Sequence, residues 1–97
     1  MNIEIAPKTT EIQATWDEAV MYCFFLEIDG KKGWRLPTKE ELDYIYHSKN
    51  DFIDAYYWSS TEYNGSSAWG QVFTSGTQFS SSKNGGSYYV RAIRDII

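Results

Sequence analysis

The chain has a single cysteine and a single histidine among its 97 residues, and this scarcity excludes several kinds of protein. Cys23 has no partner with which to form an intrachain disulfide, and a cysteine-rich metal site is impossible. Because His47 is the only imidazole, a metal site with two histidine ligands is excluded too. The same count removes most histidine-based catalytic triads.

Long apolar runs are also missing. No segment approaches the ~20 apolar residues that a helix needs to cross a bilayer. The first residues contain neither a basic start nor an apolar run of about 7–15 residues, so the sequence predicts no secretory signal. Synthesis in the cytoplasm is expected, and assembly into a particle is left open as a route out of it.

Basic residues are too few to balance the acidic ones. Nine Lys and Arg stand against thirteen Asp and Glu, for a net charge of −4. Nucleic acids and anionic membranes select basic surfaces. The sequence therefore predicts neither a nucleic acid nor a membrane as a partner.

Aromatic side chains, by contrast, are abundant. Phe, Trp and Tyr make up 18% of the residues, and apolar residues as a whole make up 42%. This composition is typical of a folded chain, and large rings fill a thin core efficiently. The length fits a single domain over residues 1–97.

Two capping boxes predict helices in the first half. In the first, the Thr15 hydroxyl can accept from the amide of Glu18, whose carboxylate reaches back to the Thr15 amide. We expect this helix to run from Trp16 to about Ile28 and to end at Asp29-Gly30. Its apolar residues recur at helical spacing on one face, which should be buried: Trp16, Ala19, Val20, Cys23 and Phe24.

The second capping box consists of Thr38 and Glu41, directly after Pro37. The helix that it begins should fray near residues 48–50. From residue 56 onward the apolar period shortens toward two, and turn residues alternate with short strands. Strands are expected over 56–61, 68–74, 77–82 and 88–94, with turns at 64–65 and 75–76 and a hairpin loop at 83–86. Two helices followed by a small twisted antiparallel sheet describe an α+β domain.

Five motifs occur in an order that resembles a known family. They are WDEA with YC (16–19 and 22–23), WRLPTKEEL (34–42), YWSSTE (57–62), AW with F (68–69 and 73) and YVRAIR (89–94). The chain thereby resembles the domain of unknown function numbered 1566 (DUF1566), which forms the C-terminal domain of a Legionella collagen-like adhesin and occurs in bacterial surface proteins and some phage proteins. The resemblance covers about residues 15–94. It implies a compact C-type-lectin-like fold, related to the formylglycine-generating enzymes.

The chain departs from the pattern of that family in two places. Members often carry a second cysteine in the closing strand, where this chain has Ala92, so the disulfide to Cys23 that the resemblance would imply cannot form. Members also have more sequence before the first helix. Here Ile3–Ile5 and Thr9–Ile12 must supply any edge strand.

The sequence gives little support for a catalytic function. Ser59, Ser60 and Thr61 offer three hydroxyls in a row, but a serine nucleophile needs a base within reach, and His47 lies in a polar helix end. The enzymes that share the fold implied by the resemblance use a cysteine pair or several histidines. This chain has only one cysteine and one histidine, so it can supply neither set. We therefore expect no enzyme and no cofactor. Arg35 should pair with an acid such as Glu41, and Arg91 or Arg94 should be paired in the same way.

Oxygen ligands for a hard cation are present but scattered. Asn50, Asp51 and Asp54 form one group, and Glu62 and Asn64 form another, but neither is a dense acidic loop. No metal site is predicted, and a structural calcium ion is left as an alternative.

The loops of the second half are the better candidates for function. Residues 62–67 and 74–87 combine Ser, Thr, Asn, Gly and Gln with aromatic rings, a composition typical of surfaces that bind proteins or sugars. The sequence predicts a non-catalytic binding module for a protein or glycan surface. The alternative is a structural, self-associating subunit: a homo-oligomer or a component of a virion. The candidate binding residues are Tyr63, Asn64, Trp69, Gln71, Gln78, Phe79, Lys83, Asn84, Tyr88 and Tyr89.

Overall fold

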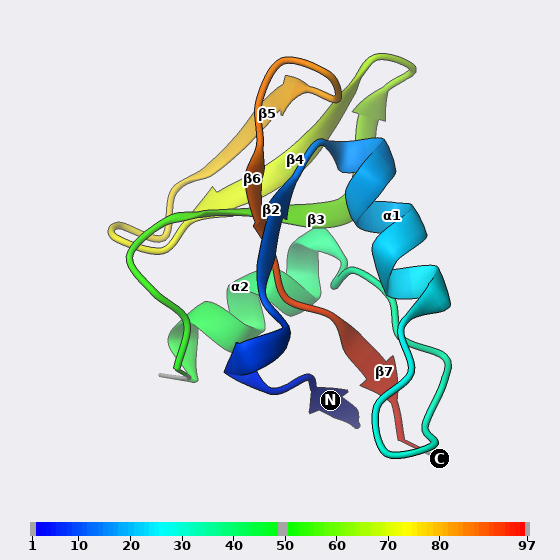
Figure 1. The fold of residues 1–97 in the computed structure, drawn as a ribbon. Helices are drawn as coiled ribbons and strands as arrows, with labels where there is room; N and C mark the ends of the chain where they lie inside the picture. Colours follow the sequence, from blue (N-terminus) through cyan, green and yellow to red (C-terminus); the bar gives the residue numbers. More distant parts are fainter. Residues whose placement is uncertain (1, 49–50, 97) are drawn as a thin grey trace.

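The computed structural model describes residues 2–48 and 51–96, and within them it shows an α+β domain, as expected (Figure 1). Both ends of the chain lie at the same end of the molecule, where the first and last strands pair. The helices are α1 (Trp16–Phe25) and α2 (Lys39–His47), preceded by a short 3₁₀ helix, η1 (Lys8–Thr10). The strands are β1 (Ile3–Ile5), β2 (Ile12–Ala14), β3 (Tyr56–Asn64), β4 (Ser67–Val72), β5 (Gln78–Ser82), β6 (Tyr88–Val90) and β7 (Ile93–Asp95).

The main sheet has five strands in the order β2-β6-β3-β4-β5, and β1 pairs separately with β7. All neighbours are antiparallel except β3 and β6, which are parallel, so the expected purely antiparallel sheet is corrected to a mixed one. Helix α2 contacts β3 and β4, whereas α1 contacts β2 and β3. No helix in the described ranges is long and apolar enough to cross a membrane.

The expected hairpin at residues 83–86 is wrong. Strand β5 lies at the edge of the sheet, and the chain then crosses to β6 in its interior, between β2 and β3. Strand β5 is mostly serine, which suits an edge, whereas Val90 at the end of β6 is fully buried and needs neighbours on both sides. The expected strand over 88–94 is also interrupted at Arg91, whose guanidinium turns into a buried ion pair with Glu11.

Helix α1 ends earlier than predicted. Its capping box forms as expected, but Leu26 is already extended, and Ile28 pairs with Lys31 across a turn in which Asp29 and Gly30 have positive φ. Asp29-Gly30 therefore closes a small bridge beyond the helix and does not cap it. The capping box of α2 also forms, although Lys49 and Asn50 lie outside the described residues, so the expected fraying can be followed only as far as Ser48.

The N-terminal edge is partly as predicted. Ile3–Ile5 forms β1, but the expected strand over Thr9–Ile12 is wrong, because residues 8–10 form η1 and the strand is Ile12–Ala14.

Two neighbouring residues of β3 divide the core. Side chains alternate along a strand, so Trp58 packs with the α1 cluster and Tyr57 with the α2 cluster. Both are about 1% exposed, and the Trp58 indole donates to the carbonyl of Ala14 at 2.9 Å. Ala19 and Cys23 bury the inner face of α1 as expected, but Val20 and Phe24 are exposed, which corrects the predicted buried face.

The expected Arg35–Glu41 pair forms, with nitrogen–oxygen distances of 2.7 and 2.8 Å. Asp95 accepts from the same guanidinium at 2.8 Å. The hydrogen bonds from Arg35, together with those from the Thr38 amide and hydroxyl, outweigh the effect of burial and hold the pKa of Glu41 at about 2. The arginine thus joins the start of α2 to the last strand.

The pKa of Glu41 predicts an acid-labile fold. Because the carboxyl binds its proton more tightly in the unfolded chain, the stabilisation is complete above pH ~4.5 and is lost as the pH falls toward ~2. With partial solvent screening, it should amount to roughly 2 kcal/mol. Urea unfolding curves at pH values across this window measure it. Glu41→Gln should flatten the dependence, and an equally steep loss in that variant would contradict this role of Glu41.

Candidate functional site

The two predicted loop regions do not form one surface. Ser67 pairs with Ser82 and Gln71 pairs with Gln78, so the β3–β4 turn lies beside residues 83–87 at one end of β5 (Figure 1). The turn at 73–77 lies at the opposite end, and residues 78–82 are strand β5. Residues 62–67 and 83–87 thus form one site, which we call the loop tip.

Lys83 holds the loop tip together from within. Its ammonium donates to Glu62 at 2.7 Å and to the Gly65 carbonyl at 3.2 Å, and it lies 4.5 Å from the centre of the Trp16 ring. The backbone amide of Lys83 donates to the Ser66 carbonyl at 2.9 Å, and the Lys83 carbonyl accepts from the Trp16 amide. One residue therefore joins β3, the β3–β4 turn and the start of α1, which fixes the two loops relative to each other.

Removing the Lys83 ammonium should loosen the loop tip. Lys83→Met keeps the apolar stem but leaves Glu62 and the Gly65 carbonyl without their donor, which should cost about 1–3 kcal/mol of unfolding free energy. Amide hydrogen exchange should accelerate most within the loop tip. Lys32→Met, at a side chain that is 78% exposed, is the control. Unchanged exchange at the loop tip in Lys83→Met would show that Lys83 does not order it.

Three of the predicted residues are exposed at the loop tip. Tyr63 is 57% exposed, and its ring stands nearly perpendicular to that of Trp69 at 5.5 Å. The Asn64 side-chain oxygen accepts from the amide of Ser66 at 2.9 Å, which fixes the turn. Asn84 is exposed on the neighbouring loop. The loop tip therefore presents one aromatic ring and two amide side chains.

Trp69 and Gln78 lie on the α2 side of the sheet, Trp69 beside Tyr63 of the loop tip and Gln78 at the opposite end of β5. The Lys39 ammonium lies 3.7 Å from the centre of the Trp69 ring and covers it. The Gln78 side chain donates to the Lys39 carbonyl at 2.9 Å. Both residues are half-buried and are engaged with the start of α2.

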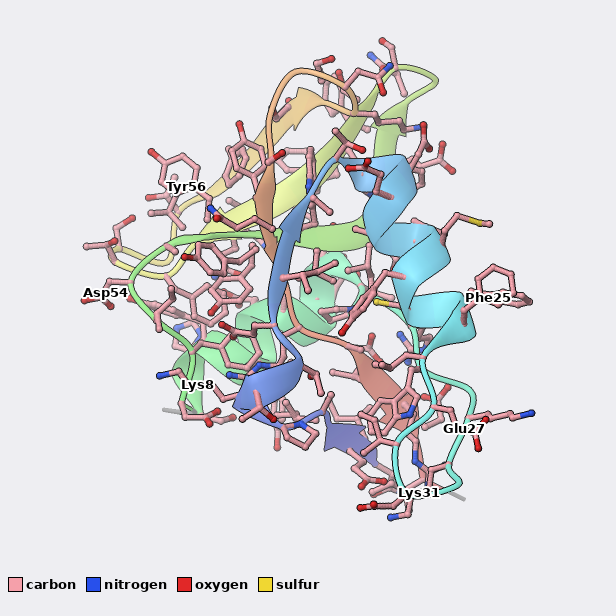
Figure 2. The ribbon with its side chains drawn as sticks, viewed as in Figure 1. Lys8, Phe25, Glu27, Lys31, Asp54 and Tyr56 are labelled. Atoms are coloured by element: carbon pink, nitrogen blue, oxygen red, sulfur yellow. The ribbon has the colours of Figure 1, made fainter. Side chains whose placement is uncertain are left out.

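Phe79 and Tyr88 lie on the opposite face of the sheet, together with Tyr56, which sequence reasoning missed. Their ring centres are 5.3–5.6 Å apart, and Tyr56 is 48% exposed and points away from the sheet (Figure 2). Tyr89 packs instead against Tyr57 on the α2 side. The predicted aromatic residues are thus divided between two faces.

Two predicted binding residues are buried. The Gln71 side chain is inaccessible and donates to Asp43 at 2.9 Å and to the Gly76 carbonyl at 3.0 Å. Lys83 is 8% exposed and serves the internal contacts described above. Neither side chain can meet a ligand at the surface, because each is used to join neighbouring segments.

The WRLPT and YWSST motifs contact each other. The Ser60 amide donates to the Pro37 carbonyl at 2.7 Å, and the Thr61 hydroxyl accepts from the Lys39 amide at 2.8 Å. The register of β3 against β4 shifts in this region, as at a β-bulge, which exposes these backbone groups to α2. The Thr61 hydroxyl and the Ser60 amide thus position the start of the second helix.

The structure does not pair Ser59 with His47. Ser59 is fully buried and donates to the Trp69 carbonyl at 2.6 Å, whereas His47 is exposed at the end of α2 and hydrogen-bonds the Asp43 carbonyl. Burial raises the pKa of Cys23 to about 12, so its thiol is protonated at neutral pH.

The predicted cation ligands are dispersed as well. Asp51 accepts from Arg91, Glu62 accepts from Lys83, and Asn50 lies outside the described residues. Within residues 2–48 and 51–96, no three His, Cys, Asp or Glu side chains are grouped closely enough to hold a metal ion.

The model of the Lcl C-terminal domain family, from the Legionella collagen-like protein, matches residues 3–94. The chain belongs to this family. The match spans both helices and reaches into β7, and it confirms this part of the resemblance carried by the five motifs. No curated protein matches the chain. Where the resemblance places a second cysteine, the Lcl C-terminal domain of this chain has Ala92, which packs in the same core cluster as Cys23.

Sequence reasoning also missed a surface on α1. Met21, Phe24 and Phe25 are exposed there together with Val20. Residues 20–26 are seven apolar residues in succession, and on a helix such a run places apolar side chains on every side. That run was the sequence signal for an exposed apolar surface, because a helix that packs on one face needs only a single stripe of apolar residues.

Proposed function

We propose that this Lcl C-terminal domain is a non-catalytic recognition module that binds a protein or glycan surface through the loop tip. The observation that supports this most is the internal fixation of two polar loops by Lys83, with Tyr63, Asn64 and Asn84 exposed around it. Loops that are ordered before binding lose less conformational freedom when they bind.

The chemistry of the exposed groups supports recognition by hydrogen bonding and ring contact. An amide side chain both donates and accepts, and a tyrosine offers a rigid apolar face with a polar hydroxyl. The exposed carboxylate of Glu62 is paired with the Lys83 ammonium at 2.7 Å, so the two charges offset each other beside these groups. The loop tip therefore suits a ligand with hydroxyl and amide groups better than a strongly charged one.

We propose further that the fold is the C-type-lectin-like one that the sequence motifs imply, together with the DUF1566 relationship. The paired chain ends, the two helices and the small mixed sheet support this assignment. In such an arrangement the loop tip is carried by strands, which hold a binding surface more rigidly than a free loop does.

Glycan and protein arrays test the proposed site. Wild-type protein should retain a ligand, and the double variant Tyr63→Ala/Asn84→Ala should lose at least about tenfold in affinity, since these side chains supply the accessible contacts. Thr74→Ala is the matched control, because Thr74 is exposed in the turn at the far end of β5. Equal binding by the double variant and wild type would exclude the loop tip. Turnover of a substrate that depended on Ser59 or His47 would contradict a non-catalytic role.

A further inference from the structure

Strand β5 forms one edge of the five-stranded sheet, and no other strand of the described residues pairs with its outer side (Figure 1). The opposite edge is β2, which has three residues and contacts α1. Strand β5 has five residues, and its register against β4 runs from one end to the other without a shift. It contains no lysine, proline or bulge, the features that usually keep an edge strand from pairing. The edge at β5 is therefore the one suited to a further strand.

The hydrogen bonds at the two ends of the β4–β5 pairing show which backbone groups point outward. The Val72 amide donates to the Thr77 carbonyl at 2.8 Å, and the Lys83 amide donates to the Ser66 carbonyl at 2.9 Å. In an antiparallel pair, hydrogen-bonded residues alternate along the strand with residues whose backbone groups face the other way. The odd-numbered residues of β5 therefore bond to β4, and the even-numbered ones turn their backbone groups outward.

Three residues of β5 present backbone groups along this edge. Gln78, Ser80 and Ser82 each turn an amide and a carbonyl outward, and the Ser82 carbonyl accepts from the Gly85 amide at 3.2 Å. Within residues 2–48 and 51–96, the three amides and the other two carbonyls have no hydrogen-bond partner. Donors and acceptors in such a row, at the repeat of a strand, are complementary to another extended backbone.

An aromatic cluster borders the same edge on one face of the sheet. The Phe79 ring lies over Gly70, where an added Cβ would be 2.7 Å from it, and its centre is 5.3 Å from that of Tyr56 and 5.5 Å from that of Tyr88. A residue placed opposite Phe79 on a new strand would project to the same face and pack against this cluster. The next residue would project to the other face, beside the exposed Ser80. The edge therefore suits a strand that alternates apolar and polar side chains.

We propose that the outer edge of β5 binds an extended segment of a partner protein as a sixth strand of the sheet. The segment runs antiparallel to β5, since that pairing is the more stable one. Its main chain pairs with Gln78, Ser80 and Ser82, and its apolar side chains pack against Phe79. It needs no charged residue, because β5 has none. This surface is separate from the loop tip, and the proposal does not depend on recognition there.

A second copy of this chain fits the edge less well. Two β5 strands paired across a two-fold axis at Ser80 would place Phe79 of each copy opposite Ser81 of the other. The aromatic ring would then meet a hydroxyl group instead of an apolar side chain. Cross-strand pairs of aromatic and β-branched residues are the ones that stabilise a sheet, so a partner with valine or isoleucine at that position is favoured.

A synthetic peptide tests the proposal. The probe is a capped heptapeptide in which three valines alternate with four threonines, and the readout is amide hydrogen exchange in the whole chain, followed by NMR. In the free protein, the Ser80 amide should exchange faster than those of Phe79 and Ser81, which donate to β4. Saturating peptide should slow the exchange at Ser80 at least about tenfold, because its amide is then paired.

Methylated peptides distinguish backbone pairing from simple apolar contact. When the valines face Phe79, the threonine amides point toward β5 and the valine amides point away. N-methylation of two threonine amides should weaken binding at least about tenfold, and N-methylation of two valine amides should leave it within about threefold. In the protein, Ser80→Pro removes an outward amide and should block the peptide. Ser80→Ala keeps the backbone unchanged and is the matched control, which should bind like wild type.

The methylated peptides are tested on wild-type protein, so their result stands even if Ser80→Pro does not fold. No binding of the probe to wild type at up to about 1 mM would overturn the proposal, and so would an equal loss from the two methylation patterns. Protection of the Ser80 amide that grows with protein concentration, in the absence of peptide, would overturn it in favour of a second copy. Tyr63→Ala/Asn84→Ala should bind the probe like wild type, which separates this edge from the loop tip.

Discussion

Changing Glu11 to alanine should lower the free energy of unfolding by about 3–5 kcal/mol, because it leaves a buried arginine without its main counter-charge. The Arg91 side chain is 1% exposed and that of Glu11 is 8% exposed, and they lie 2.8 Å apart. Glu11 also accepts from the Tyr57 hydroxyl at 2.7 Å. For a domain of this size the loss corresponds to a fall in melting temperature of about 12–40 °C.

Urea unfolding of Glu11→Ala beside Glu40→Ala measures this effect. Glu40 is exposed in the first turn of α2, so its loss should change stability by less than about 0.5 kcal/mol. Adding Arg91→Met to Glu11→Ala should recover part of the loss, since the uncompensated charge is then gone. A cost below about 1 kcal/mol for Glu11→Ala would mean that Asp51, 2.9 Å from Arg91, is a sufficient partner.

Changing Gly70 to alanine should lower the free energy of unfolding by about 3 kcal/mol, because the added methyl group overpacks the sheet. A methyl group at this position would lie 2.6 Å from the Tyr57 carbonyl oxygen and 2.7 Å from the Phe79 ring. Gly70 pairs directly with Trp58 on β3, so relief requires moving the central strand and its two core aromatics. Overpacking of this kind costs about 1–3 kcal/mol and more where backbone is the obstacle.

Thermal melting of Gly70→Ala and Gly65→Ala separates packing from the general effect of removing a glycine. A methyl group on Gly65 meets nothing within 4 Å, so that variant should melt close to wild type. Phe79→Ala added to Gly70→Ala should restore only part of the stability, because the clash with the Tyr57 carbonyl persists. A Gly70→Ala protein as stable as Gly65→Ala would show that β3 and β4 are more loosely packed than described.

The parts of the fold that could be predicted are those set by neighbours in sequence. The capping boxes at Thr15 and Thr38 depend on residues three positions away, and both form. The position of β6 could not be predicted in the same way. Its place between β2 and β3 depends on pairing Val90 with Ile12, far apart in the chain, and on the turn of Arg91 out of the sheet.

The same contrast holds for the candidate site. The polar turn at Asn64 could be recognised from composition, and it lies exposed at the loop tip. Lys83 and Gln71 are polar residues in a polar region. Their partners, Glu62 and Asp43, lie far away in the sequence, so the neighbouring residues do not show that these two side chains are buried. The apolar run on α1 was visible, but a periodic pattern cannot show which of its faces meets the core.

Chemical-shift mapping by NMR tests the central claim most directly. An array-selected glycan or protein is titrated into the isotope-labelled domain. If the loop tip is the recognition surface, the largest shifts fall on the amides of residues 62–67 and 83–87, and the turn at 73–77 stays unchanged. Largest shifts on α1 or on the turn at 73–77, with the loop tip unchanged, would contradict the account.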